Sequence, residues 1–334
     1  MAKTIKNEYE KALSYENLMK AHLQSRKGKG YRKEIILFNL RQEEYIMWLY
    51  EQLKTQKYKH GGYTVFYITE PKLRRIEKSK YIDRIVHRWY VNSFIKPYFI
   101  PKFIETSYAC LENKGMHKAC LDVQKAMKHC KNIWGKYYIL KMDIKKYFEN
   151  INKNIVYEIL QRKIKDEKIL WLTREILYSN NGENNLPIGN YTSQMFANIY
   201  LNELDQYVKH KLKGKYYFRY MDDAVLMRKT KEETKQDLEN IKEFLREQLK
   251  LELNKKTQIF KNKQGINFCG YKINEYRLKM RDKGKRKLKK KVKELKQKIK
   301  QGKTSSKEAK RYLAGHLGYM KIANVKNLKE SLFF

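Results

Sequence analysis

Two adjacent carboxylates, Asp222 and Asp223, interrupt an apolar stretch that runs from Tyr217 to Met227. Both flanks have the composition of β-strands, so the sequence predicts a hairpin with the acidic pair at its tight turn. Carboxylates among apolar side chains are costly unless a cation neutralises them, and a divalent metal ion is a common solution. The alternative is a solvated hairpin turn without chemistry. In either case the stretch favours a β-hairpin.

A second carboxylate follows another strand-like run upstream. Residues 137–144 are rich in aromatic and β-branched side chains, and Asp143 lies near their end. An Asp on one strand that faces an Asp pair on a neighbouring hairpin gives the cluster needed for two magnesium ions. Such ions activate an attacking hydroxyl and stabilise a leaving pyrophosphate. Taken alone, Asp143 is equally well explained as the N-cap of a helix over residues 145–150; the downstream hairpin favours the catalytic interpretation.

The charge of the chain indicates what it binds. The formal net charge is +39 over 334 residues, and it is spread along the chain. A polyanion that neutralises such self-repulsion is the expected partner, which points to nucleic acid. An acidic membrane surface is the competing explanation, but no apolar stretch approaches the length of a transmembrane helix. Residues 1–16 are polar and do not resemble a secretory signal, so we expect no membrane and a cytoplasmic location.

Hydrophobic periodicity predicts a mixed α/β (α+β) chain with 42% hydrophobic residues, enough for a substantial core. We predict three regions, residues 1–133, 134–275 and 276–334, the last of which is helical and basic. The helices are expected at residues 7–24, 34–58, 81–95, 116–130, 193–210 and 231–250. The strands are expected at residues 63–69 (ended by Pro71), 137–144, 216–220, 224–228 and 267–273.

The region over residues 276–334 combines an apolar stripe with dense positive charge. Apolar residues recur at helical spacing, at Leu288, Val292, Leu295 and Ile299. Between Arg281 and Lys300 there are twelve Lys or Arg residues and two acidic ones. Like charges at neighbouring helical positions destabilise a bare helix, so this face is expected to grip a nucleic-acid backbone rather than to be merely solvated.

Taken in order along the chain, these and further segments resemble the motifs of reverse transcriptases. Asp143 with Phe148 resembles polymerase motif A, and Tyr220 to Asp223 resembles motif C. The other resembling segments are residues 71–76 and 83–87 (fingers), 186–194 (motif B), 251–257 (motif D) and 265–271 (the primer grip, motif E). The resemblance implies a right-hand polymerase that synthesises DNA on an RNA template. Residues 1–133 would then form an N-terminal extension and the fingers, residues 134–275 the palm, and residues 276–334 a basic helical thumb.

The resemblance also implies a set of metal ligands. Asp143 and Asp222 would bind the ions directly, Asp223 would support them, and the backbone carbonyl of Ile144 would contribute a further ligand. The expected cofactor is Mg²⁺, two ions, with Mn²⁺ as a substitute. A non-catalytic nucleic-acid-binding protein on a polymerase scaffold is the alternative, and the intact Asp set argues against it.

The remaining site residues implied by the resemblance bind the nucleotide or the primer. Phe148 would exclude the ribose 2′-hydroxyl, although a core Phe is the alternative. Gly189 would allow close backbone approach to the nascent base pair. Further nucleotide-binding candidates are Arg74, Arg75, Ile188, Gln194 and Lys256, and the primer or template candidates are Tyr220, Phe268, Gly270 and Tyr271.

Motif B narrows the resemblance further. Most reverse transcriptases carry Gln-Gly-x-x-x-Ser-Pro there, whereas this chain has Ile188 and Gln194 at the two outer positions. That form resembles the enzymes of diversity-generating retroelements. It implies copying of a template RNA with errors at template adenines, a primer, cDNA and dNTPs as partners, and a small basic helical accessory protein. A retron, abortive-infection or reduced group II intron enzyme is the alternative.

Overall fold

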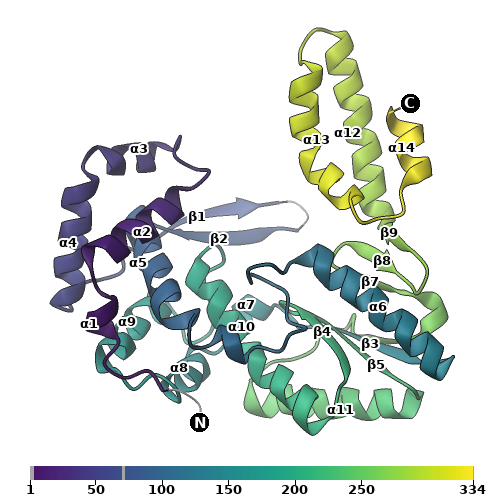
Figure 1. The fold of residues 1–334 in the computed structure, drawn as a ribbon, viewed down its shortest axis with the longest axis horizontal. Coiled ribbons are helices and arrows are strands. Elements are labelled where there is room, and N and C mark those ends of the chain that lie inside the picture. Colours follow the sequence, from purple (N-terminus) through teal and green to yellow (C-terminus); the bar gives the residue numbers. More distant parts are fainter. Residues whose placement is uncertain (1–3, 70–71, 334) are drawn as a thin grey trace. The chain divides into compact units, whose positions relative to one another are not determined.

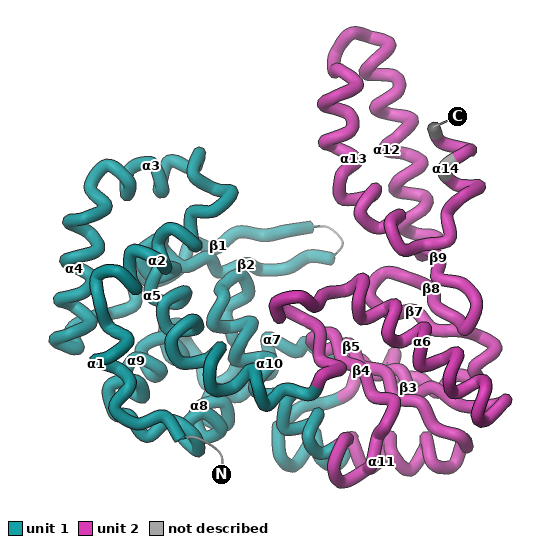
Figure 2. The backbone as a smooth tube through the Cα atoms, viewed as in Figure 1, with its two compact units in different colours: residues 1–104, 144–207, 242–252 teal, residues 105–143, 208–241, 253–334 magenta. Residues whose placement is uncertain are grey.

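The computed structural model describes residues 4–69 and 72–333, and Figure 1 shows their helices and strands. The chain divides into two compact units, which Figure 2 colours separately. The first unit contains residues 1–104, 144–207 and 242–252, and the second contains residues 105–143, 208–241 and 253–334. The predicted fingers, palm and thumb boundaries follow chain order and remain a prediction. Pro71, predicted to end the first strand, lies outside the described residues.

The N-terminal part of the first unit has more, shorter helices than the sequence predicted. The backbone of Leu13 is extended, and the Ser14 side chain accepts a hydrogen bond from the Asn17 amide, so a new helix begins there. The helix predicted over residues 34–58 is likewise broken at Arg41, whose backbone (φ −134°, ψ 37°) is not helical. The resulting helices are α1 (Tyr9–Ala12), α2 (Tyr15–Arg26), α3 (Lys33–Leu40) and α4 (Gln42–Lys54).

A β-hairpin follows these helices. Strands β1 (Tyr63–Ile68) and β2 (Arg74–Ser79) pair antiparallel, from Tyr63 opposite Ser79 to Ile68 opposite Arg74. The hairpin is exposed along most of β1, whereas the second half of β2 is buried. Strand β2 was not predicted, because its sequence is dominated by charged residues.

The remaining helices of the first unit surround α10 (Tyr191–Gln206), most of whose side chains are buried. Helix α10 packs against α5 (Tyr81–Tyr90) and α8 (Lys153–Gln161). Because none of its residues is exposed, α10 is a core helix rather than an amphipathic surface helix, although several of its buried side chains are polar. The other elements here are a π-helical turn (Val91–Ile95), a 3₁₀ turn (Ile100–Lys102), α7 (Tyr147–Asn150) and α9 (Glu167–Leu177).

The second unit contains a four-stranded antiparallel sheet in the order β4-β5-β3-β6. Its strands are β3 (Tyr138–Asp143), β4 (Tyr216–Tyr220), β5 (Asp223–Arg228) and β6 (Gln258–Lys261). The first three correspond to predicted strands. Helix α6 (Met116–Trp134) buries Cys120, Val123 and Met127 in one core with residues of the sheet such as Ile139 and Val225. This packing holds the ends of β3 and β5 in a fixed register.

A second, three-stranded sheet adjoins this core. The single strand predicted over residues 267–273 is two strands, because Cys269 and Gly270 both have positive φ angles (45° and 87°) and reverse the chain. The strands are β7 (Ile266–Phe268), β8 (Tyr271–Ile273) and β9 (Leu278–Met280).

Three helices end the chain: α12 (Asp282–Lys300), α13 (Ser306–Met320) and α14 (Lys326–Phe333). Leu288, Val292 and Leu295 of α12 are buried against α13, as the periodicity predicted. Ile299, the fourth residue of the predicted stripe, is 37% exposed because it lies in the last turn of α12, beyond that packing. Helix α11 (Lys231–Gln248) and the π-helical turn Tyr207–Lys211 contain residues of both units. Within the described part of the chain, no helix is long and apolar enough to cross a membrane.

Candidate active site

The predicted carboxylates meet at one end of the main sheet of the second unit. Asp143, the last residue of β3, lies directly opposite Asp223, the first residue of β5. Tyr220, the last residue of β4, is the other cross-strand partner of Asp223. Asp222 therefore occupies the β4–β5 turn itself, as the sequence predicted. Asp223, predicted for the same turn, instead lies in the sheet, because it pairs with both Tyr220 and Asp143 as the first residue of β5. Cross-strand partners have Cβ atoms about 4.5–5.5 Å apart, so the register brings the carboxylates of two strands together.

The turn that holds Asp222 is braced from within the core. Met221 has a left-handed backbone (φ 55°), which a non-glycine residue adopts only where the surroundings enforce it. The buried Arg219 contributes to this, because its Nη1 donates a hydrogen bond of 3.0 Å to the Met221 carbonyl. Arg219 was not recognised from the sequence, since an Arg within a strand gives no sign of which way it points.

Asp223 is neutralised by a lysine in this structure. The Lys141 Nζ forms an ion pair with the Asp223 carboxylate, and the two side chains are only 14% and 24% exposed. Burial raises the pKa of Asp223 to about 6; Lys141 opposes the shift, and Asp222 and Asp143 add to it. Lys141 also lies 5.8 Å from the centre of the Phe268 ring. The sequence analysis missed Lys141, although its position two residues before Asp143 could have suggested a shared strand face.

Asp143 is fixed by the segment that resembles motif D. Its carbonyl accepts a hydrogen bond of 2.7 Å from the Asn254 amide, and its amide donates one of 3.4 Å to the Thr257 hydroxyl. These contacts hold the backbone and leave the carboxylate for other partners. Ile144, whose carbonyl was predicted to be a metal ligand, follows directly in sequence, and its side chain is buried.

A cavity of about 730 Å³ opens beside the carboxylates within the second unit. Asp143 and Asp223 line it together with four cationic side chains: Lys141, Lys256, Lys272 and Arg281. Cations that surround a pair of carboxylates suit an anionic substrate that also carries metal ions. Lys256, the predicted nucleotide contact of motif D, therefore shares a cavity with two of the predicted catalytic residues.

The carboxylates at this end of the sheet fit a divalent ion that takes its remaining ligands from the substrate. Within residues 4–69 and 72–333, no three His, Cys, Asp or Glu side chains are gathered as ready-made metal ligands. Mg²⁺ usually binds through one or two carboxylates together with substrate phosphates and waters. Asp143 and the turn residue Asp222 are the two carboxylates that would supply that minimum, while Asp223 is paired with Lys141.

The predicted primer-grip residues lie in the β7–β8 hairpin of the same unit. Phe268 and Tyr271 are fully buried, and the Tyr271 hydroxyl donates a hydrogen bond of 3.0 Å to the Tyr319 carbonyl. A Cβ on Gly270 would lie 2.8 Å from the Tyr319 ring, so the turn packs closely on α13. Phe268 and Tyr271 thus anchor the hairpin, and Tyr220 is half-buried against the same core.

The other predicted nucleotide-binding residues belong to the first unit. Arg74 and Arg75 are exposed on β2, and the Arg75 guanidinium lies 2.7 Å from the buried Glu77 carboxylate. Phe148 is half-buried in α7, 5.6 Å from the Tyr147 ring centre to centre, and Gln194 lies in the first turn of α10.

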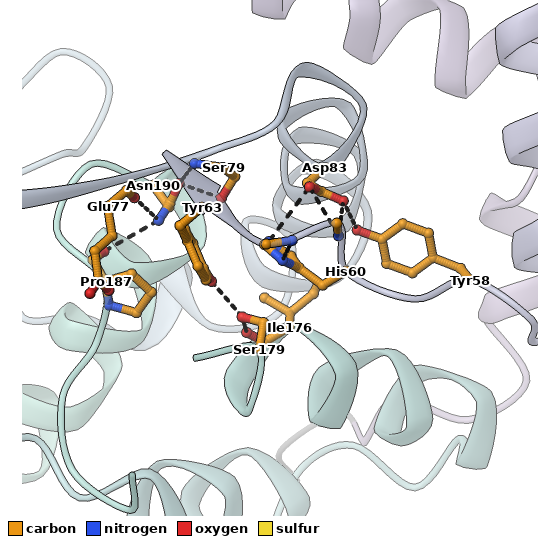
Figure 3. Close-up of polar contacts among 12 residues, drawn as sticks. Tyr58, His60, Tyr63, Glu77, Ser79, Asp83, Ile176, Ser179, Pro187 and Asn190 are labelled. Atoms are coloured by element: carbon orange, nitrogen blue, oxygen red, sulfur yellow. Dashed lines mark hydrogen bonds and ion pairs between the residues drawn. The ribbon is translucent and has the colours of Figure 1, made fainter. Parts of the chain in front are cut away.

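Ile188 and Gly189 are held against β2 by backbone contacts. The Ile188 carbonyl accepts a hydrogen bond of 3.0 Å from the Glu77 amide. Gly189 has φ +123°, and a Cβ there would lie 3.0 Å from the Ile76 Cγ2. Figure 3 shows the neighbouring Asn190 between Glu77, Ser79 and Pro187. Asn190 was not singled out from the sequence.

Comparison with known proteins places the chain in a family. Residues 69–273 match the family described as "Reverse transcriptase (RNA-dependent DNA polymerase)". The chain is 26% identical over 243 residues to Protein YkfC of Escherichia coli, covering 60% of this chain and 63% of that one. It is 24% identical over 305 residues to the group II intron-encoded protein LtrA of Lactococcus lactis, covering 69% and 50%.

The chain thus spans from about half to under two thirds of the length of these two curated relatives. Among solved structures, the apo telomerase from Candida tropicalis is similar, with a TM-score of 0.49 and 12% identity over 66% of this chain and 49% of that one.

Proposed function

The chain belongs to the reverse transcriptase family, and from this premise we propose that it is an RNA-directed DNA polymerase. Its mixed α/β fold is the fold class that the sequence predicted for a right-hand polymerase. The observation that carries the proposal is the register of β3 and β5, which sets Asp143 opposite Asp223 with Asp222 in the adjoining turn. The cation-lined cavity beside them suits an incoming triphosphate and a primer terminus.

The carboxylates would hold Mg²⁺, which Mn²⁺ can replace. Asp143 and Asp222 are the proposed direct ligands, with the Ile144 carbonyl as a further one. When bound, a pair of such ions activates the primer 3′-hydroxyl and stabilises the leaving pyrophosphate. Asp223, held by Lys141, would keep the local charge balanced until the anionic substrate and its ions arrive. Lys256 lines the cavity and would contact the phosphates of the nucleotide or the pyrophosphate.

The residues of the first unit would select the nucleotide. Arg74 and Arg75 have exposed guanidinium groups suited to bidentate contact with a triphosphate. Phe148 is proposed to exclude the ribose 2′-hydroxyl. Ile188, Gly189 and Gln194 are proposed to contact the nascent base pair.

The primer and template would be held by the second unit. Tyr220 and the β7–β8 hairpin, with Phe268, Gly270 and Tyr271, would position the primer terminus. The basic face of α12 would bind the duplex backbone through phosphate contacts, which give affinity without sequence preference.

The finer proposal is that the enzyme copies a retroelement template RNA with errors at template adenines. Its support is the pair Ile188 and Gln194 in motif B. Ile188 stands where most reverse transcriptases have Gln, and the change would remove a polar contact to the incoming nucleotide. One hydrogen bond contributes about 0.5–1.5 kcal/mol, or a two- to tenfold change in discrimination. Because that is too small for wholesale mutagenesis, a second contribution from the template RNA or an accessory protein is part of the proposal.

A small basic helical accessory protein would find a complementary surface on α3 and α4. Ile36, Leu37 and Leu40 of α3, with Met47 and Trp48 of α4, are between 47% and 76% exposed. The solvent face of α4 also carries three exposed acids: Glu43, Glu44 and Glu51. An apolar, acid-flanked face on a chain of net charge +39 suits a cationic amphipathic helix and repels nucleic acid. Trp48→Ser should weaken binding of the accessory protein, whereas Leu73→Ser, 70% exposed on another segment, should not.

The polymerase proposal is tested with Asp222→Asn. The variant should lose magnesium-dependent extension of a DNA primer on RNA, because the carboxylate holds metal, and should keep RNA affinity, because dispersed Lys and Arg provide it. Asp282→Asn, at an 83% exposed carboxylate that starts α12, is the matched control and should extend normally. Wild-type extension by Asp222→Asn would refute the site assignment.

The finer proposal is tested by sequencing the cDNA made with the cognate RNA and the accessory protein. Substitutions should concentrate at template adenines, and Ile188→Gln should reduce them. Low, uniform error at all four template bases would leave an ordinary bacterial reverse transcriptase, of the retron, abortive-infection or reduced group II intron type.

A further inference from the structure

Asn190 lies at the start of α10, where an Asn side chain usually caps the helix. It is the N-cap of α10, and an Asn there usually accepts a hydrogen bond from the first turn of its own helix. The Asn190 side chain makes no such bond. It is instead 2% exposed and directed at a neighbouring strand of the same unit. Helix α10 thus begins without the capping contact that this residue could provide.

The Asn190 carboxamide pairs with the backbone of β2, as Figure 3 shows. Its Nδ2 donates to the Glu77 carbonyl at 2.9 Å and to the Pro187 carbonyl at 3.4 Å. Its Oδ1 accepts from the Ser79 amide at 3.2 Å and from the Ser79 hydroxyl at 2.6 Å. All four hydrogen-bonding positions of the amide are therefore used.

These contacts make the side chain a substitute for a strand backbone. The edge of β2 away from β1 presents the Glu77 amide and carbonyl and the Ser79 amide. The Ile188 carbonyl takes the Glu77 amide, and the Asn190 carboxamide takes the other two. A third strand would satisfy this edge with its own peptide groups. Here the turn and the Asn190 side chain satisfy these hydrogen bonds, so the backbone of Ile188 and Gly189 does not form a strand.

The strand held in this way carries the proposed triphosphate contacts. Arg74 and Arg75 begin β2, and the Arg75 guanidinium is tied to Glu77, the residue bonded to both Ile188 and Asn190. Ile76 of the same strand lies against Gly189. The turn with Ile188 and Gly189 and the strand with both arginines are thus one connected structure.

We propose that Asn190 is a positioning residue that sets the turn with Ile188 and Gly189 in register with the arginines of β2, and so determines how tightly and how selectively the enzyme binds the incoming nucleotide. This proposal rests on the proposed function, because that function assigns the nucleotide to these residues. Asn190 itself touches neither the nucleotide nor the reacting atoms. It acts through Glu77 and Ser79, and its effect is on nucleotide affinity rather than on the chemical step.

The test uses Asn190→Asp, which keeps the size of the side chain and an acceptor for Ser79 but loses the donor to Glu77. Because a carboxylate buried beside two carbonyl oxygens costs stability, the folding of each variant is checked by circular dichroism before binding is measured. The equilibrium Kd of the next complementary dNTP is measured on a complex of full-length enzyme, template RNA and dideoxy-terminated primer, which needs no chemistry. Asn190→Ala and Ser79→Ala are measured alongside. Asn202→Asp, in the same helix with one bond to Gln206, is the matched control.

We expect Asn190→Asp to raise the dNTP Kd about tenfold and to reduce the preference for the matched nucleotide, with RNA affinity unchanged. Ser79→Ala should have a smaller effect, about twofold, since one of the four bonds is lost. Asn202→Asp should behave as the wild type. Unchanged dNTP affinity and selectivity in a folded Asn190→Asp enzyme would overturn the proposal, and so would an equal loss of RNA affinity.

The same experiment separates this proposal from the proposed function. If the wild type binds the dNTP in the dideoxy-terminated complex but never extends a normal primer, the polymerase proposal fails. The Kd comparison among the variants still decides the role of Asn190 in that case.

Discussion

Gly189→Ala is a direct test of how closely the turn before α10 packs on β2. Gly189 has φ +123°, a conformation that L-residues rarely adopt, and its Cα faces β2. A Cβ there would lie 3.0 Å from the Ile76 Cγ2 and 3.6 Å from the Glu77 carbonyl oxygen. The substitution therefore combines backbone strain with a steric contact.

The magnitude follows from these two terms. Holding a non-glycine residue in such a conformation costs about 1–3 kcal/mol. The contact with Ile76 adds about 1 kcal/mol if its methyl group shifts only slightly. A total of about 2–4 kcal/mol exceeds the roughly 1.4 kcal/mol that changes an equilibrium tenfold. The turn should therefore move away from β2, and apparent nucleotide affinity should fall by about tenfold or more as the competent arrangement becomes the minor one.

The assay is the dNTP concentration dependence of primer extension, together with urea unfolding. Gly62→Ala is the matched control, because Gly62 also has a positive φ (+83°), but a Cβ added there would meet no other atom within 4 Å. It should lose stability without losing nucleotide affinity. Ile76→Ala in the Gly189→Ala background removes the contacting methyl group and should recover part of the affinity, as a double-mutant cycle would reveal.

Two results would refute this reasoning. If Gly189→Ala bound and incorporated nucleotides as the wild type does, the close approach of the turn to β2 would be irrelevant to the site. If Gly62→Ala weakened nucleotide binding as strongly, the effect would come from general loss of stability rather than from the contact with Ile76.

Three further predictions concern pH, salt and the sugar. Burial lowers the pKa of His87 to about 3, so the side chain stays neutral in the folded protein, whereas in the unfolded chain it is protonated below about pH 6.5. The free energy of unfolding should therefore be highest above pH 6.5 and fall by about 2 kcal/mol at pH 5. Urea unfolding of His87→Phe should show a flatter pH dependence than that of the wild type. RNA binding should weaken steeply with salt, because many phosphates are neutralised; a flat response in filter binding would favour a different partner for the charge. Phe148→Ala should incorporate ribonucleotides, and unchanged discrimination between ribo- and deoxynucleotides would make Phe148 a core residue.

The hairpin of β4 and β5 could be predicted from the sequence because local patterns determine it. Strand-forming residues flank the acidic pair of Asp222 and Asp223, which indicates a hairpin, although Asp223 itself proved to be the first residue of β5 rather than part of the turn. The strand before Asp143 was predicted for the same reason, and its pairing with β5 places Asp143 opposite Asp223. Helix α12 likewise followed from the spacing of Leu288, Val292 and Leu295.

The breaks within two predicted elements could not be predicted from the sequence, because they depend on the backbone angles of single residues. Residues 34–58 have continuous helical spacing, yet Arg41 leaves the helical region and divides them into two helices. Residues 267–273 look like one strand, yet the positive φ angles of Cys269 and Gly270 reverse the chain. Favourable packing on both sides of the break outweighs the modest local preference for continuity.

The sequence by itself determined the chemistry available to this protein: its carboxylates, its positive charge, and the order of the segments that carry them. Only the tertiary structure decided which groups pair. Lys141 neutralises Asp223 across 82 residues of chain, and Asn190 completes the edge of β2 by bonding Ser79 across 111 residues. Such contacts produce no periodic pattern in the sequence, because each involves a single pair of side chains. Periodicity reports which face of an element is buried, whereas the individual partner depends on how distant segments come together.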